Sequence, residues 1–149
     1  MQIYIDGDAC PVKFEALRVA ARHALPVVLV SNQWLRGLDA PLVRQQVVPN
    51  TPDAADDWIT EHIQPGDICV TADIPLAARV IKAGAACIGP NGKPFTEAGI
   101  GAALATRNLL TQLREQGAIN SQSAAFNKRD RSSFLNGFEQ MIQAVKRKG

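Results

Sequence analysis

The sequence has few cysteines and histidines, the residues whose disulfides and zinc sites stabilise many small proteins. Its 149 residues include three cysteines and two histidines, none at the spacing of a disulfide framework or a structural zinc site. No apolar run approaches the ~18 residues that a membrane-spanning helix needs, and the N-terminus lacks the segments of a secretory signal. We therefore expect a cytoplasmic protein. Cys69 and Cys87 should be core residues, while Cys10 either packs in the core or reacts beside its acidic neighbours.

The length and composition are those of a single domain. A chain of 149 residues with 46% hydrophobic content can bury one core. The net charge of +2 conceals a split, because residues 1–106 hold 8 Lys/Arg against 11 Asp/Glu, whereas residues 107–149 hold 8 against 3. An acidic part beside a basic part suits a metal site that acts on a phosphate polymer, and is equally typical of a solvated basic helix.

Short apolar runs alternate with helical patterns along most of the chain. The pattern predicts an α/β fold with a mainly parallel central sheet and helices on both faces. We expect strands at residues 3–5, 27–30, 43–48, 68–72 and 86–88, and helices at residues 11–24, 53–63, 75–83, 96–116 and 132–148. Residues 117–131 are polar and read as a mobile loop, which together with the last helix forms a basic region at about 117–149.

Acidic residues gather at three points that such a fold would bring together. They follow the first strand, open the second helix and follow the fourth strand: Asp6, Asp8, Asp53, Asp56, Asp57 and Asp73. Ligands of parallel sheets bind beyond the carboxyl ends of the strands, where Asn32 also falls. Because converging carboxylates repel each other unless a cation or shared protons lie between them, the pattern indicates a divalent metal site.

Each acidic group also has an ordinary structural explanation. Asp6-Gly7-Asp8 could be an acidic turn, and Asp73 could be only a helix N-cap. Acids in the first turn of a helix complement its dipole. Three acids at positions i, i+3 and i+4 repel one another, however, and this repulsion favours a ligand role for the group that begins at Asp53.

Two sets of segments resemble known proteins. Ala-Asp-Asp at residues 55–57, followed by Thr-Ala-Asp at 71–73, resembles the paired acidic motifs with which the PIN-like and flap-nuclease superfamily holds divalent cations. Four segments together resemble the YaiI/YqxD family of uncharacterised bacterial proteins over essentially the whole chain: residues 4–11, 52–57, 71–77 and 126–131. The resemblance implies a single PIN-like domain over residues 1–149, a three-layer sandwich and a metal-dependent nuclease site. Flap nucleases have an acid directly before Ala-Asp-Asp, a place that Ala54 fills here.

The leading functional hypothesis is a Mg²⁺- or Mn²⁺-dependent nuclease that acts on RNA rather than DNA. Its catalytic residues would be Asp6, Asp8, Asp56 and Asp73. Its metal ligands would come from Asp6, Asp53, Asp56, Asp57 and Asp73. Its contacts with nucleic acid would come from Asn32, Lys128, Arg129 and Arg131. Trp34 and Trp58 could stack on a base, although single aromatic residues more often pack inside the protein.

Two other functions remain open. Asp-x-Asp after a first strand is also the nucleophile motif of haloacid-dehalogenase-like phosphatases, in which Asp6 would be phosphorylated and Asp8 would be the acid/base. Lys82 is the possible charge partner of that site, but a later Asp-Asp metal motif is missing. The third reading is a non-catalytic nucleic-acid-binding module, which would bind metal without cleaving its polymer.

Overall fold

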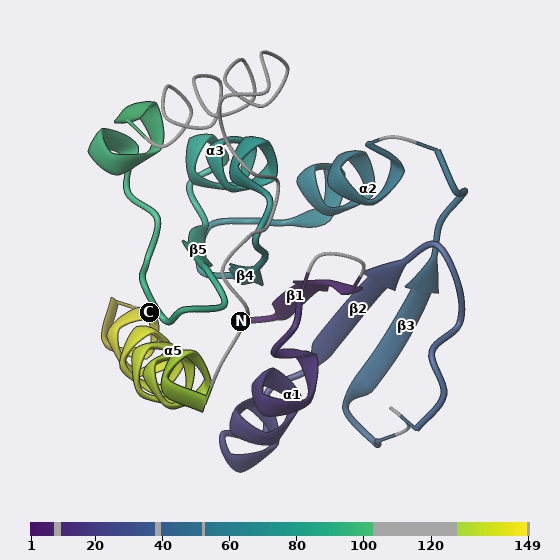
Figure 1. Ribbon diagram of the computed structural model, residues 1–149, viewed down its shortest axis with the longest axis horizontal. Helices are drawn as coiled ribbons and strands as arrows, with labels where there is room; N and C mark the ends of the chain where they lie inside the picture. Colours follow the sequence, from purple (N-terminus) through teal and green to yellow (C-terminus); the bar gives the residue numbers. More distant parts are fainter. Residues whose placement is uncertain (8–9, 38–39, 52, 103–127, 149) are drawn as a thin grey trace, which may run out of the picture.

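A parallel sheet with its first strand in the centre organises the protein. The computed structural model describes residues 1–7, 10–37, 40–51, 53–102 and 128–148. Within these residues, five strands pair in the order β3-β2-β1-β4-β5, and every neighbouring pair is parallel (Figure 1). The strands are β1 (Ile3–Asp6), β2 (Val27–Ser31), β3 (Val43–Val47), β4 (Ile68–Val70) and β5 (Ala86–Ile88).

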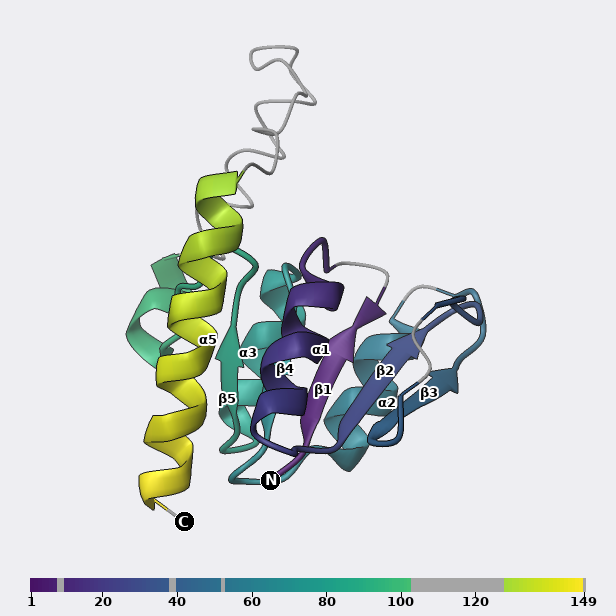
Figure 2. The same cartoon turned by 90° about the horizontal axis from the view of Figure 1, so that it is seen from below.

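Helices cover both faces of the sheet, so the fold is an α/β three-layer sandwich, as the sequence pattern predicts (Figure 2). One face carries α1 (Lys13–Arg22) and α5 (Lys128–Lys148), and the other carries α2 (Ala54–His62) and α3 (Ile74–Lys82). Successive strand residues alternate between the two layers. Ile5 of β1 packs in the same cluster as Phe134 of α5, whereas its neighbour Tyr4 packs in the cluster of Leu76 of α3.

The C-terminal helix α5 is held against the sheet by a close backbone contact. Gly92 has φ +83°, and a Cβ there would overlap the carbonyl of Ser133 in α5. A Cβ at Gly137 of α5 would in turn overlap the carbonyl of Gly92. Glycine at both positions therefore lets the chain after β5 approach the helix more closely than any other residue would allow.

Polar contacts join α5 to the end of α1. The Glu139 carboxylate lies 2.8 Å from His23 Nε2 and 3.2 Å from Arg22 Nη2. Lys146 Nζ lies 2.9 Å from His23 Nδ1. Phe134 and Phe138 of the same helix are fully buried in the core cluster that also contains residues of α1. The helix is thus fixed by both its apolar and its polar side.

One expectation about the basic region was wrong. Lys128, Arg129 and Arg131 lie in the first turns of α5, which begins at Lys128, and not in a loop. Lys and Arg are good helix formers, and burial of the apolar stripe that begins at Phe134 stabilises the turns ahead of it. Residues 103–127, which include most of the helix expected at 96–116, lie outside the described residues, although 97–102 are helical as expected.

The three cysteines are buried, in agreement with a packing role. Burial raises the pKa of the Cys10 thiol to about 12, so this thiol stays protonated at neutral pH and is a poor nucleophile. No helix among the described residues is long and apolar enough to cross a membrane.

Candidate metal centre at the carboxyl edge of the sheet

Three carboxylates from three different elements converge where the central strands end. Asp6 is the last residue of β1, Asp56 lies in the first turn of α2, and Asp73 is the N-cap of α3. One carboxylate oxygen of each lies within 4.8 Å of the others. We call these three residues the acidic cluster. They are 50 and 17 positions apart in sequence, so the fold alone brings them together.

The acidic cluster lines an open pocket of about 230 Å³. The other lining residues come mainly from the segment between β3 and α2, with one from the end of β2: Asn32, Val48, Pro49, Thr51, Asp53 and Ala55. The Asn32 amide donates a hydrogen bond to Asn50 Oδ1 at 2.9 Å, which ties the end of β2 to this segment. The pocket has room for an ion together with its water ligands.

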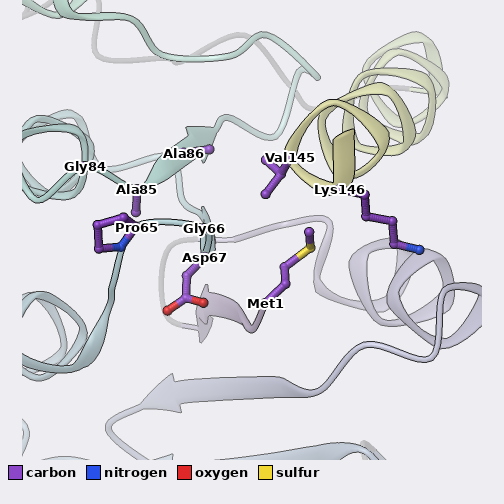
Figure 3. Close-up of a pocket in the computed structure, with 9 residues that line it drawn as sticks. All are labelled: Met1, Pro65, Gly66, Asp67, Gly84, Ala85, Ala86, Val145 and Lys146. Carbon is purple, nitrogen blue, oxygen red and sulfur yellow. The ribbon is translucent and has the colours of Figure 1, made fainter. Parts of the chain in front are cut away.

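A larger pocket of about 710 Å³ lies at the amino ends of the strands, opposite to the carboxyl ends that carry the acidic cluster (Figure 3). Its lining includes the small residues Gly66, Gly84 and Ala85, and its carboxylate, Asp67, accepts hydrogen bonds from the backbone N–H groups of Gln2 and Gln64. These bonds satisfy Asp67 as a structural link between β1 and the turn before β4. The group of carboxylates that could hold a cation therefore lines the smaller pocket.

Thr71 links two members of the acidic cluster. Its hydroxyl donates to Asp6 Oδ2 at 3.0 Å and accepts from the backbone N–H of Asp73, also at 3.0 Å. Asp73 Oδ1 in turn accepts from the N–H of Leu76 at 3.2 Å and so caps α3. Thr71 itself is fully buried. Thr71 was not among the expected site residues, although its place in the Thr-Ala-Asp motif was the available signal.

The electrostatics of the cluster favour a bound cation. Burial first, and then the charges of Asp73, Asp6 and Asp53, raise the pKa of Asp56 to about 6, while Arg79 opposes them. Carboxylate oxygens are hard ligands, which suit Mg²⁺ and Mn²⁺. Ligands on opposite sides of Mg²⁺ lie about 4.2 Å apart, twice the Mg–O distance. The three oxygens already lie within 4.8 Å of one another. Small rotations of the side chains would bring two of them to opposite positions, or all three to adjacent positions about 3 Å apart, so the residues fit a metal.

The remaining acidic candidates lie outside the cluster. Asp57 points elsewhere, because its carboxylate forms an exposed ion pair with Arg79 at 2.9 Å. Asp53 lines the pocket from the N-cap of α2, where its φ is +68° and its side chain makes no capping hydrogen bond. Asp8 lies outside the described residues. The acids at 53, 56 and 57 therefore do not act as one group, since Asp53 precedes the helix and Asp57 faces away.

Comparison with known sequences shows the family of the chain. The profile of the YaiI/YqxD family, described as uncharacterised, matches residues 4–144. The chain belongs to the YaiI/YqxD family. The UPF0178 protein of Rhodospirillum rubrum is 56% identical over 148 residues, which cover 99% of both chains. The UPF0178 protein of Parvibaculum lavamentivorans is 53% identical over 147 residues, or 99% of this chain and 97% of the relative. No solved structure matches the chain.

The basic candidates of this YaiI/YqxD protein lie on the α1 side of the sheet. Arg131 Nη1 lies 3.7 Å from Glu15 Oε1, so the first turns of α5 and of α1 are neighbours. Lys128 and Arg129 are exposed on the same part of α5. Figure 2 shows that this end of α5 lies toward the edge at which the strand arrows end. The cations and the acidic cluster therefore lie toward the same end of the strands.

The raised pKa of Asp56 predicts how the metal-free YaiI/YqxD protein responds to pH. Its pKa is about 6 in the fold against an ordinary 3.8, so folding favours the protonated acid. This contribution to stability is present below pH 4 and is lost as pH rises through 6. With EDTA, the melting temperature at pH 5 relative to pH 7.5 should be higher for the wild type than for Asp56→Asn. Parallel pH profiles of the two proteins would contradict the shift.

Proposed function

We propose that this YaiI/YqxD protein is a divalent-cation-dependent nuclease of the PIN-like type, which hydrolyses phosphodiester bonds in RNA more readily than in DNA. The observation that carries the proposal is the convergence of Asp6, Asp56 and Asp73 at an open pocket on the carboxyl edge of a parallel sheet. Structural carboxylates are usually paired with cations or hydrogen-bond donors. Here the nearest charges to Asp56 are mainly other carboxylates, an arrangement that a bound cation stabilises.

The residues of the chain divide into distinct roles under this proposal. Asp6, Asp56 and Asp73 would hold Mg²⁺ or Mn²⁺, which when bound lowers the pKa of a water ligand and neutralises charge on the scissile phosphate. Thr71 is a positioning residue, because its hydroxyl fixes Asp6 relative to the start of α3. Asp53, on the wall of the same pocket, is placed to orient the attacking water or accept its proton. Water adds across one P–O bond, and the leaving oxygen takes up a proton.

A polymeric substrate is supported by the cations that share the edge with the pocket. The first turns of α5 carry Lys128, Arg129 and Arg131, and α1 begins with Lys13, whose Nζ lies 3.5 Å from the carbonyl oxygen of Gly7. Gly7 directly follows Asp6. Such cations would neutralise phosphates on either side of the scissile one, which makes affinity depend on salt.

The geometry supports the phosphatase alternative less well. Asp6 is 4% exposed and its Oδ2 is engaged by Thr71, which makes it a poor nucleophile. Lys82 ends the nine-residue helix that Asp73 caps. At about 1.5 Å per residue, α3 separates Lys82 from the cluster by roughly 13 Å along its axis. Lys82 is therefore too remote to stabilise a phosphoryl group on Asp6.

Cleavage of labelled nucleic acids tests the proposal. The wild-type protein should cleave single-stranded RNA in Mn²⁺ or Mg²⁺, should cleave DNA more slowly, and should do neither in EDTA. Cleavage that persists in EDTA would contradict a metal mechanism. Formation of a stable beryllium fluoride adduct on Asp6 would instead support the phosphatase, and binding of Mn²⁺ and RNA without turnover would support the non-catalytic module.

A further inference from the structure

Two aromatic side chains are exposed where most others are packed. Among the described residues, Phe14 is 57% exposed and Trp34 is 59% exposed. By contrast, Trp58 stacks on His62 with a centroid separation of 3.8 Å, and the rings of Phe134 and Phe138 are fully buried. In a chain with only 5% aromatic residues, leaving two large rings in water forgoes burial that would stabilise the fold. A binding role would account for their exposure.

The backbone on both sides of Trp34 is fixed, although its ring is not covered. On one side, the Ser31 hydroxyl donates to the carbonyl of Gln33 at 2.7 Å. On the other side, the Gln45 amide accepts from the N–H of Leu35 at 2.9 Å and donates to its carbonyl at 2.8 Å. Leu35 also packs against the core cluster of the α1 face. Because this segment is anchored at both ends, the indole is presented outward from a rigid base, which lowers the entropy cost of binding.

Both aromatic residues belong to segments that begin where the central strands β1 and β2 end. Gly7, which follows Asp6 of the acidic cluster, lies against Ser31, since a Cβ built on Gly7 would be 3.1 Å from Ser31 Cβ. Ser31 holds the turn that leads to Trp34. The Gly7 carbonyl accepts a hydrogen bond at 3.5 Å from Lys13, the neighbour of Phe14 in the first turn of α1. The Lys13 ammonium and the two segments that carry the exposed rings thus lie next to the point at which β1 ends.

We propose that Phe14 and Trp34 are base-stacking positions that hold an unpaired nucleotide strand, with Lys13 contacting a phosphate between them and the acidic cluster. This inference rests on the proposed function, and it narrows the substrate to single strands. Every base has a π-face, so stacking on an aromatic ring tolerates any sequence. The bases of a duplex are already stacked on each other, so that placing one of them on a protein ring costs the energy of unstacking and unpairing it. Rings and cations together are the combination that single-strand-binding surfaces use.

Binding measured without turnover tests the inference. The protein is titrated in EDTA into labelled single-stranded RNA, single-stranded DNA and the matching duplexes. Trp34→Ala and Phe14→Ala should each weaken binding of the single strands by about 5- to 150-fold, with duplex binding unchanged. Trp34→Phe should keep most of the affinity, because it retains a stacking ring. Leu42→Ala is the matched control. Leu42 is also exposed (45%), but it precedes β3 and so lies at the amino ends of the strands, away from their carboxyl ends.

The outcomes separate this inference from the proposed nuclease function. Single-strand affinities of Trp34→Ala and Phe14→Ala equal to that of the wild type, or an equal loss in Leu42→Ala, would overturn the stacking site even if metal-dependent cleavage is intact. The expected losses of affinity in a protein that never cleaves would support the stacking site and overturn the nuclease. Melting temperatures of the variants should match the wild type, because exposed side chains usually alter stability by within about 0.5 kcal/mol.

Discussion

Replacing Asp56 by Asn should lower metal-dependent cleavage by about 100-fold or more, whereas replacing its neighbour Asp57 by Asn should leave cleavage within about threefold of the wild type. Asp56 lies in the acidic cluster, and a metal ion in a hydrolytic site is worth several kcal/mol of transition-state stabilisation. Asp57 forms an exposed ion pair with Arg79, which contributes little. The rates are compared at saturating Mn²⁺ on the same single-stranded RNA.

The same two variants show whether a loss of metal binding comes from losing Asp56 in particular or from losing any acid in α2. Mn²⁺ at about 100 times its Kd should stabilise the wild type by about 2.7 kcal/mol, which is a rise in melting temperature of about 5–10 °C. Asp57→Asn should show the same rise. Asp56→Asn should show little, and without metal it should be at least as stable as the wild type, because a repulsive charge is gone. An equal rise in both variants would remove Asp56 from the metal site.

Replacing Gly137 by Ala should destabilise the protein by about 1–3 kcal/mol, which is the usual cost of overpacking. On an exposed helix the same change would stabilise by about 1 kcal/mol. Here the new Cβ would overlap the carbonyl of Gly92, which is backbone and cannot move aside without displacing the chain after β5. The free energy of unfolding is measured by urea titration.

Asn136→Ala is the control for this change. Asn136 is the adjacent residue of α5 and is exposed, so alanine there should leave the stability unchanged or raise it by a few tenths of a kcal/mol. A Gly137→Ala protein as stable as Asn136→Ala would mean that α5 does not pack this closely against the turn at Gly92.

The features that sequence reasoning predicted are those set by short-range pattern. All five expected strands are present, and a helix lies between most successive strands, which favours a parallel arrangement. β2 and β3 are also parallel, although the described residues between them form no helix. Asp6 and Asp73 could be assigned to one edge because both follow such runs. Asp56 could be predicted only as one of three candidate acids. What distinguishes it from Asp57 is that Asp57 pairs with Arg79, which lies 22 residues further along the chain.

What could not be predicted depends on contacts between distant residues. The first turns of α5 looked like part of a loop, because their sequence is polar and the packing that supports the helix comes from the sheet and from α1. The contact between His23 and Glu139 could not be predicted either, because the two residues are 116 positions apart in the sequence. The backbone next to Trp34 is held by two hydrogen bonds between Leu35 and Gln45, which lies ten residues further along the chain. A single sequence contains no local signal for any of these contacts.

The central place of β1 has a consequence for how the protein is assembled. Ile3 pairs with Val27 on one side and with Ile68 on the other, so the middle of the sheet is bounded by chain segments 24 and 65 residues away. On a ribosome, the first strand to emerge must wait for both neighbours, and the face later covered by α5 stays open until residues 128–148 follow. Parallel sheets closed by such long loops fold slowly and expose apolar surface meanwhile. The nascent chain is therefore most vulnerable to aggregation before its last helix docks.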